Sequence, residues 1–216
     1  MDLYKNKRGN SVIEIIVVII IVTIGIVGAY GIINSGQKLS TTSENRIKAI
    51  NIAREWLEAV ENIRDTNWLK FSSDYDNCWK VKDYNVTCIW YTPPNPNILS
   101  GSNILVQSGV LWTLSGVSSP ASIATAYTAY IDQFPVFLDS NGLTTTSGSL
   151  TMTKCTPSIT TNCRSMFSRE IQVINNPVDN DHMTIHSIVT WVDSWKTSWP
   201  YIIDLETTLT NWKKKF

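Results

Sequence analysis

A single carboxylate lies inside the longest apolar block of the chain. Glu14 is followed by 23 residues without a charge, Ile15 to Gln37. An ionised carboxylate at the centre of a membrane-spanning helix costs about 2.5–3.5 kcal/mol on insertion scales, so an acidic residue in such a block indicates a functional site. The alternative interpretation is that Glu14 reaches the lipid headgroups, because the basic residues Lys7 and Arg8 lie close upstream.

Four cysteines form the second group with defined chemistry. They allow three pairings. The sequence favours Cys78 with Cys88 and Cys155 with Cys163, because each pair brackets a short, turn-rich segment. A zinc site is the alternative. It ranks below disulfides, since no C-x-x-C spacing occurs and the two histidines are distant in sequence.

The histidines offer a second metal hypothesis. His182 and His186 would share one face of a strand, with Asp179 and Asp181 just upstream. Such a turn could hold calcium or a transition metal, but the spacing matches no EF-hand pattern, so a solvated turn with two surface histidines is favoured. No G-x-S-x-G, P-loop or H-E-x-x-H motif occurs. The sequence gives no case for an enzyme, a metal or a cofactor.

Nine tryptophans are many for this length. Trp56 and Trp191 are in phase with apolar neighbours, which predicts core positions. Trp195 and Trp199 fall in the turn segment 194–200, and exposed aromatic residues often mark contact surfaces for protein or sugar. For these two, packing against the sheet edge is ranked first, subunit contact second and glycan binding third.

The apolar block that follows Glu14 is long enough to cross a bilayer. Residues 15–33 are almost entirely apolar, and about 18 such residues suffice for a spanning helix. Ordinary signal peptides have a shorter apolar region and a small-residue cleavage site after it. The basic residues before the block outweigh Asp2, which places residues 1–9 in the cytoplasm and the rest outside. Disulfides are plausible in that outer compartment.

The residues around the block resemble a known family. Lys7-Arg8-Gly9, followed by Asn10-Ser11-Val12-Ile13-Glu14 and a long aliphatic helix, is similar to the signal of type IV pilins and pseudopilins. In that family a prepilin peptidase cuts after the Gly and the new amino terminus is methylated. The resemblance implies cleavage between Gly9 and Asn10, N-methylation of Asn10, and Glu14 as the assembly carboxylate. Asn10 departs from the family, which most often has an apolar residue there.

The same resemblance implies the protein's partners and location. The partners are prepilin peptidase, other pilin subunits, an inner-membrane assembly platform, and membrane lipid before assembly. The protein would be a single-pass membrane protein, N-in and C-out, and then part of an extracellular or periplasmic filament. Loss of the leader would leave 15 basic and 17 acidic residues.

The segment after the span is amphipathic from Ser43 to Arg64. Its apolar residues fall at helical spacing; they are Ile47, Ile50, Ala53, Trp56, Leu57, Val60 and Ile63. No proline interrupts Met1 to Thr92, so one helix from Asn10 to Ile63 is predicted. Its second half needs a partner surface.

The C-terminal third supplies that surface. Segments 167–174, 183–193 and 201–210 alternate apolar and polar residues, which predicts half-buried antiparallel strands. The expected inner face consists of Phe167, Ile171, Val173, Ile185, Val189, Trp191, Tyr201, Ile203, Leu205 and Leu209. Segments 79–83 and 84–91 suggest a hairpin, 92–97 a loop, and 140–161 an exposed Ser/Thr-rich stretch with an Asn141-Gly142 turn.

Composition narrows the function classes. The 216 residues carry 18 basic and 18 acidic side chains, and this balance excludes a general nucleic-acid binder, which depends on clustered Lys and Arg. We predict an α+β fold, with a long N-terminal helix on an antiparallel sheet. Its parts are a cleaved leader (1–9), an apolar assembly helix (10–37), an amphipathic helix (38–66) and a β-rich head (67–216).

Three functions follow from these expectations. The first is a structural subunit, a minor pilin or pseudopilin, of a type IV pilus or a type II secretion-like filament. The second is a filament-tip or membrane-anchored adhesin that binds through exposed tryptophans of the head. The third is an extracellular domain that keeps its leader as an uncleaved signal anchor.

Overall fold

The computed structural model describes residues 10–74, 78–82, 88, 98, 100–108, 111–146, 148–175, 181–193 and 199–212. The chain divides into two compact units, Met1–Asn45 and Arg46–Phe216. Helix α1, Asn10–Lys70, begins in the first unit and ends in the second. The division places residues 46–66 of the amphipathic helix with the head.

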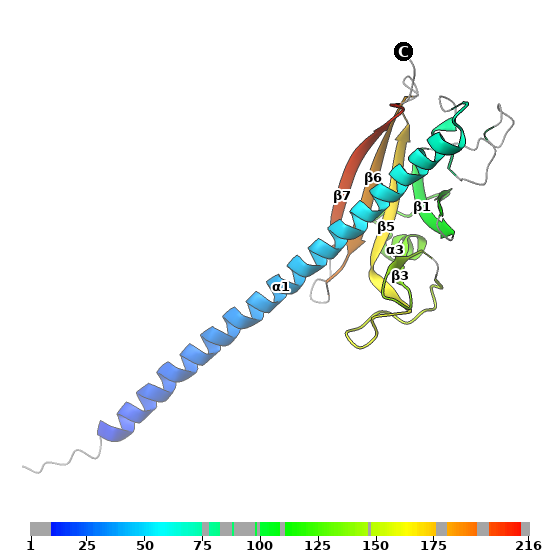
Figure 1. Cartoon of the computed structure of the whole chain (residues 1–216). Coiled ribbons are helices and arrows are strands. Elements are labelled where there is room, and N and C mark those ends of the chain that lie inside the picture. Colours follow the sequence, from blue (N-terminus) through cyan, green and yellow to red (C-terminus); the bar gives the residue numbers. More distant parts are fainter. Residues whose placement is uncertain are drawn as a thin grey trace, which may run out of the picture. The chain divides into compact units, whose positions relative to one another are not determined.

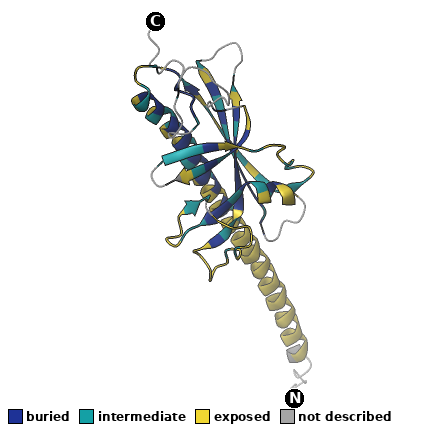
Figure 2. Cartoon of the chain, turned by 90° about the vertical axis from the view of Figure 1, so that its right-hand side faces the viewer, coloured by how far each residue is buried: buried dark blue, intermediate teal, exposed yellow. Residues whose placement is uncertain are grey.

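The first unit is helical, and its side chains are open to solvent. Every side chain from Val12 to Thr41 is exposed, which Figure 2 shows as the yellow stretch of α1. The absence of proline lets the helix run without a break.

Helix α1 ends seven residues later than the predicted Ile63. The extra residues are held by the second unit, because the buried Asn67 amide donates to the carbonyl oxygens of Trp79 and Val81, at 3.1 and 2.7 Å. The indole N–H of Trp68 donates to Asn211 Oδ1 at 3.3 Å. The predicted end was wrong because these partners lie far away in sequence.

The second unit contains a seven-stranded antiparallel sheet (Figure 1). The strands are β1 (Gly101–Ser108), β2 (Leu111–Gly116), β3 (Pro135–Leu138), β4 (Thr144–Thr145), β5 (Cys163–Asn175), β6 (His182–Trp191) and β7 (Tyr201–Thr210). Strand β5 is central. One of its edges pairs with β6, which pairs with β7; the other edge pairs with β3 and then with β1.

The predicted fold class and the C-terminal meander are confirmed. The segments predicted at 167–174, 183–193 and 201–210 correspond to β5, β6 and β7. Their register aligns Ile171 with Ser187 and Ser187 with Leu205, so their side chains share one face of the sheet. Strand β5 starts earlier than predicted, at Cys163, because its first residues pair with β3.

The core lies between this face and the second half of α1. One cluster joins Trp56, Val60 and Ile63 of the helix to Ile171 and Ile185 of the sheet. A second cluster joins Ala49, Ile52 and Ala53 to Phe167, Val189 and Trp191. Trp56 and Trp191 are buried, as their phase predicted. Ala49, Ala53 and Ala59 of the helix are buried within these clusters.

The other face of β5 is also covered. The alternation of apolar and polar residues had predicted that this face would be exposed. Ser168 and Glu170 are buried there, in contact with the short helix α3, Tyr127–Gln133. Burial raises the pKa of the Tyr130 phenol, and the Glu170 carboxylate raises it further. The alternation within β5 cannot reveal that α3 covers this face, because α3 lies 35 or more residues upstream. No element was predicted in that segment.

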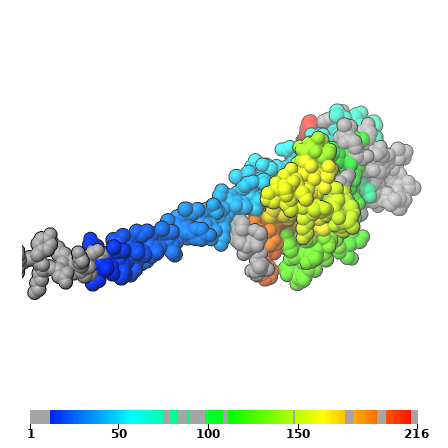
Figure 3. Space-filling view, turned by 90° about the horizontal axis from the view of Figure 1, so that it is seen from below, coloured from blue at the N-terminus to red at the C-terminus, as the bar shows by residue number. Residues whose placement is uncertain are grey.

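The Ser/Thr-rich segment 140–161 forms turns and the short strand β4, and it contributes the yellow surface of the head in Figure 3. The Asn141-Gly142 turn is present, with Gly142 at φ +76°. Asp139 Oδ1 accepts hydrogen bonds from the amides of Asn141 and Leu143, at 2.8 and 2.9 Å. The first strand of the hairpin suggested at 79–91 is not formed where the structure describes it, because residues 79–80 lie in a turn and Val81 forms a single bridge. Of the rest of 79–91 only Lys82 and Cys88 are described, and the loop at 92–97 lies outside the described residues.

Candidate functional site

The candidate assembly site is the exposed apolar half of α1. Its aliphatic side chains lie on all sides of the helix, and their exposure ranges from 47% at Val17 to 76% at Ile32. An amphipathic helix that packs on one side would bury a single stripe. This helix is apolar all round, so it requires lipid or several neighbouring helices.

Three threonine hydroxyls in and just after this segment are satisfied within the helix. Thr23 Oγ1 donates to the carbonyl oxygens of Ile19 and Ile20, both at 2.9 Å. Thr41 and Thr42 donate to the carbonyl oxygens four residues earlier. Such back-bonding lets a hydroxyl enter an apolar medium without an external partner.

Glu14 has no comparable compensation. It is exposed, and it makes no hydrogen bond or ion pair with any described residue of the chain. It is also the only charged residue from Val12 to Gln37. In apolar surroundings, its charge must be balanced by a group outside the described chain.

The helix glycines are not required for packing within the first unit. A Cβ added at Gly25, Gly28 or Gly31 would meet no atom within 4 Å. Small residues on membrane helices allow close approach of another helix. Any such approach at these glycines would involve a different molecule.

Helix α1 is long and apolar enough to cross a membrane near the N-terminus of the chain. Asn10 is its first residue. Gly9 and the rest of the leader lie outside the described residues.

The head contains two disulfides. Cys78 is bonded to Cys88 and Cys155 to Cys163, with Cα–Cα distances of 5.7 and 5.1 Å. These are the pairings that the short loops favoured. Disulfides persist in oxidising compartments, which fits a head outside the cytoplasm.

Trp199 is 61% exposed, which disfavours packing against the sheet edge, the interpretation ranked first for this residue. Tyr201 takes the place beside the core, because its ring stacks on Trp191 at 5.2 Å between centroids. Trp199 is left in solvent as a candidate contact residue. Trp195 lies outside the described residues.

His186 contacts an acidic partner on the outer face of the sheet. Its Nδ1 is 3.2 Å from each carboxylate oxygen of Asp204 on β7. His182 lies on the same face and is exposed, while Asp179 falls outside the described residues. Nowhere in the described part of the chain do three His, Cys, Asp or Glu side chains gather as a metal site would require.

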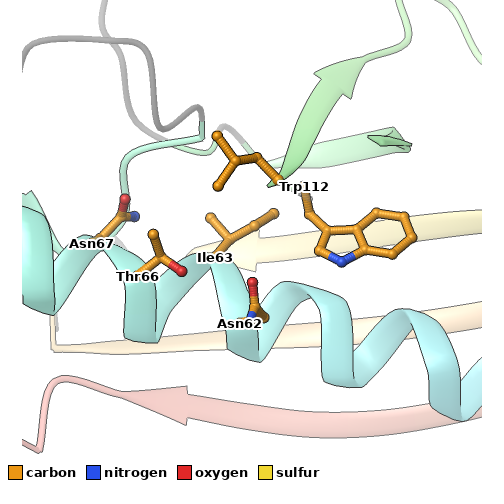
Figure 4. A pocket seen from close by; sticks show the side chains of 6 residues that line it. Asn62, Ile63, Thr66, Asn67 and Trp112 are labelled. Carbon is orange, nitrogen blue, oxygen red and sulfur yellow. The ribbon is translucent and has the colours of Figure 1, made fainter. Parts of the chain in front are cut away.

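A hollow between α1 and β2 is too small for a substrate. It is lined by Asn62, Ile63, Thr66, Asn67, Leu111 and Trp112 (Figure 4). Its volume of about 10 Å³ is room for roughly one water molecule.

A buried cation joins the helix to the sheet, and no sequence pattern indicated it. The Arg169 side chain on β5 is 1% exposed, and its guanidinium carbon lies 3.3 Å from the centroid of the Trp56 ring. Arg169 Nη1 is 3.4 Å from Glu55 Oε2, which also accepts a 2.6 Å hydrogen bond from Thr144. Burial lowers the pKa of the Arg169 guanidinium well below its usual range, and Glu55 opposes that shift.

Arg169 therefore occupies a core position in which its guanidinium is not hydrated. Its Nε has no hydrogen-bond partner among the described residues. Buried ion pairs often contribute less than an apolar replacement would, whereas loss of one partner leaves an uncompensated charge.

We expect unequal effects from removing the two partners of this pair. Arg169→Met should change the free energy of unfolding by no more than about 1 kcal/mol, because methionine needs no counter-charge and the Glu55 side chain left behind is 36% exposed. Glu55→Ala should lower it by roughly 1–2 kcal/mol, less than for a fully buried partner, because the Glu55 side chain is 36% exposed. Urea unfolding of the full chain in detergent measures both. Strong destabilisation by Arg169→Met would contradict this account.

No family model, curated protein or solved structure matches this chain.

Proposed function

We propose that the protein is a non-enzymatic filament subunit, a minor pilin or pseudopilin, inserted N-in and C-out and trimmed by a prepilin peptidase after Gly9. The observation that carries the proposal is Glu14, a carboxylate without a partner among the described residues, on the exposed and otherwise apolar first half of α1. The basic leader, the Gly9-Asn10 junction and the spacing to Glu14 support the same conclusion.

The proposed assembly step is electrostatic. Cleavage would create a positive amine on Asn10 and remove three basic residues and Asp2. In a filament core, this amine of one subunit pairs with Glu14 of a neighbour. The pair neutralises two charges, each of which would be costly alone in an apolar medium.

The apolar helix serves two environments in turn. Before assembly, lipid covers the aliphatic side chains from Val12 to Leu39; after assembly, the helices of neighbouring subunits cover them. The glycines allow those helices to approach closely. The head remains outside with its two disulfides.

The mature amino terminus tests the processing step. Intact-mass and peptide mass spectrometry of the protein from its native membrane should show a chain that begins at Asn10 and carries an N-methyl group. Coexpression with a prepilin peptidase should convert the wild type but not a Gly9→Leu variant, because the peptidase of this family cuts after Gly. Retention of Met1 to Gly9 in the wild type under both conditions would support the uncleaved anchor instead.

The exposure of Trp199 favours a second function, an adhesin that uses the same helix to reach a filament tip. Exposed indole rings bind sugars and protein surfaces. Binding of the full chain to a glycan array, lost on Trp199→Ala, would support this role in addition to assembly.

A further inference from the structure

Strand β7 is a long, free edge of the sheet. It has ten residues and pairs only with β6 among the described strands. In Figure 1 it is the outermost of the three long C-terminal strands. The opposite end of the sheet is less open, because the Leu114 amide on β2 donates to the Lys82 carbonyl oxygen at 3.1 Å. Strand β4 has only two residues.

The outer backbone groups of β7 have no partners in the described part of the chain. All backbone hydrogen bonds from Ile202 to Leu209 run to β6. Unpaired amide and carbonyl groups along a strand form a template for another strand. A row of this length can pair with an extended segment of about eight residues.

The inner side of β7 is incompletely covered. Tyr201, Ile203 and Leu205 pack against the core cluster around Trp191, yet each remains half-buried. Side chains of an edge strand that face the core stay partly exposed, because no further strand lies beside them at the open edge of the sheet. Apolar residues of an added strand would cover them.

The face of β7 that points away from the core is acidic. Asp204 and Glu206 are exposed on it, two residues apart and flanked by Ile202 and Thr208. The group that faces them from β6 is His186, beside Asp204. Basic residues at alternate positions of an added strand would lie opposite these carboxylates.

The same charges disfavour a second copy of this chain. Two β7 strands paired antiparallel around a two-fold axis at Leu205, near the middle of the strand, would set Asp204 of each copy against Glu206 of the other. Like charges directly across two strands are destabilising. Charged residues on an edge are a usual protection against self-association.

We propose that β7 is a docking edge for an extended segment of a different protein, in which apolar residues alternate with Lys or Arg. The segment adds to the sheet as an antiparallel or parallel neighbour of β7. Backbone hydrogen bonds supply the affinity and the alternating side chains supply the selectivity. This inference does not depend on filament assembly.

The test uses the full, unassembled chain in detergent micelles and two labelled peptides of about eight residues. One peptide alternates Val with Lys and the other alternates Val with Glu. We expect the Lys peptide to bind about tenfold or more tightly than the Glu peptide. We also expect it to slow hydrogen exchange of those amides between Ile202 and Leu209 that point away from β6.

Charge variants locate the effect. Asp204→Lys with Glu206→Lys should invert the preference between the two peptides. The milder pair Asp204→Asn and Glu206→Gln should abolish the preference, which keeps the test valid if the lysine variant fails to fold. Glu58→Lys with Glu61→Lys, on helix α1, should leave the preference as it is in the wild type.

Two results would overturn the proposal. The first is equal binding of both peptides, or binding without slower exchange in β7. The second is protection of the β7 amides in the absence of peptide together with a concentration-dependent dimer, because a second copy would then occupy the edge.

Discussion

Glu14→Ala is expected to yield a protein that is inserted and processed but excluded from filaments. The substitution makes the helix more apolar, so insertion into the membrane should be at least as favourable as in the wild type. It removes the only charge that a neighbour's amine could pair with between Val12 and Gln37. That amine would then be unpaired in an apolar core, and incorporation should fall at least about tenfold.

The measurement is the fraction of protein in sheared filaments relative to the membrane fraction, quantified by immunoblot. Glu14→Gln removes the charge but keeps the size of the side chain, and its incorporation into filaments should fall as far as that of Glu14→Ala. Glu58→Ala is the matched control, because Glu58 is an exposed acidic residue on the same helix but outside the apolar half. Incorporation of Glu14→Ala at the wild-type level would remove the assembly role.

Trp56→Ala is expected to cause the largest loss of stability in the head. The Trp56 side chain is fully buried between α1 and the sheet, and it also supports the Arg169 guanidinium. Truncation of a buried aromatic residue to alanine costs about 3–5 kcal/mol, because it removes the transfer free energy and leaves a cavity. Here it also exposes a buried cation to that cavity.

Trp199→Ala is the matched control, since it deletes the same atoms from a side chain that is 61% exposed. It should change the free energy of unfolding by no more than about 0.5 kcal/mol. Urea unfolding of the full chain in detergent, followed by near-ultraviolet circular dichroism, gives both values. Similar losses for the two variants would show that Trp56 is not a core anchor.

The two halves of α1 differ in what their sequence reveals. In the second half, apolar residues at helical spacing identify one buried stripe, and Trp56, Val60 and Ile63 lie in the core as predicted. In the first half the apolar residues have no preferred side, so the pattern reveals a membrane-compatible helix and no packing partner. The partner must come from another molecule.

The sheet was predictable only where alternation is strong. Strands β5, β6 and β7 were predicted because they alternate over about eight or more residues. Strands β1 to β4 and helix α3 have eight residues or fewer each, and their local patterns are too weak to identify. Their presence explains the second buried face of β5.

The candidate site divides in the same way. The position of Glu14, the apolar helix and the preference for short disulfide loops follow from near neighbours in the chain. The burial of Arg169, the exposure of Trp199 and the open edge of β7 do not, because each depends on contacts between segments many residues apart.

By itself, therefore, the sequence determined a membrane-compatible helix with one carboxylate, an amphipathic continuation, three long strands and the absence of bulk basic charge. These properties are local, since they depend on residue type and on spacings of two to four positions. Only the tertiary structure decided where α1 ends, which polar side chains are buried, and which strand is left at the edge. Those outcomes depend on which distant segments meet, and that choice is made by the packing of the whole head.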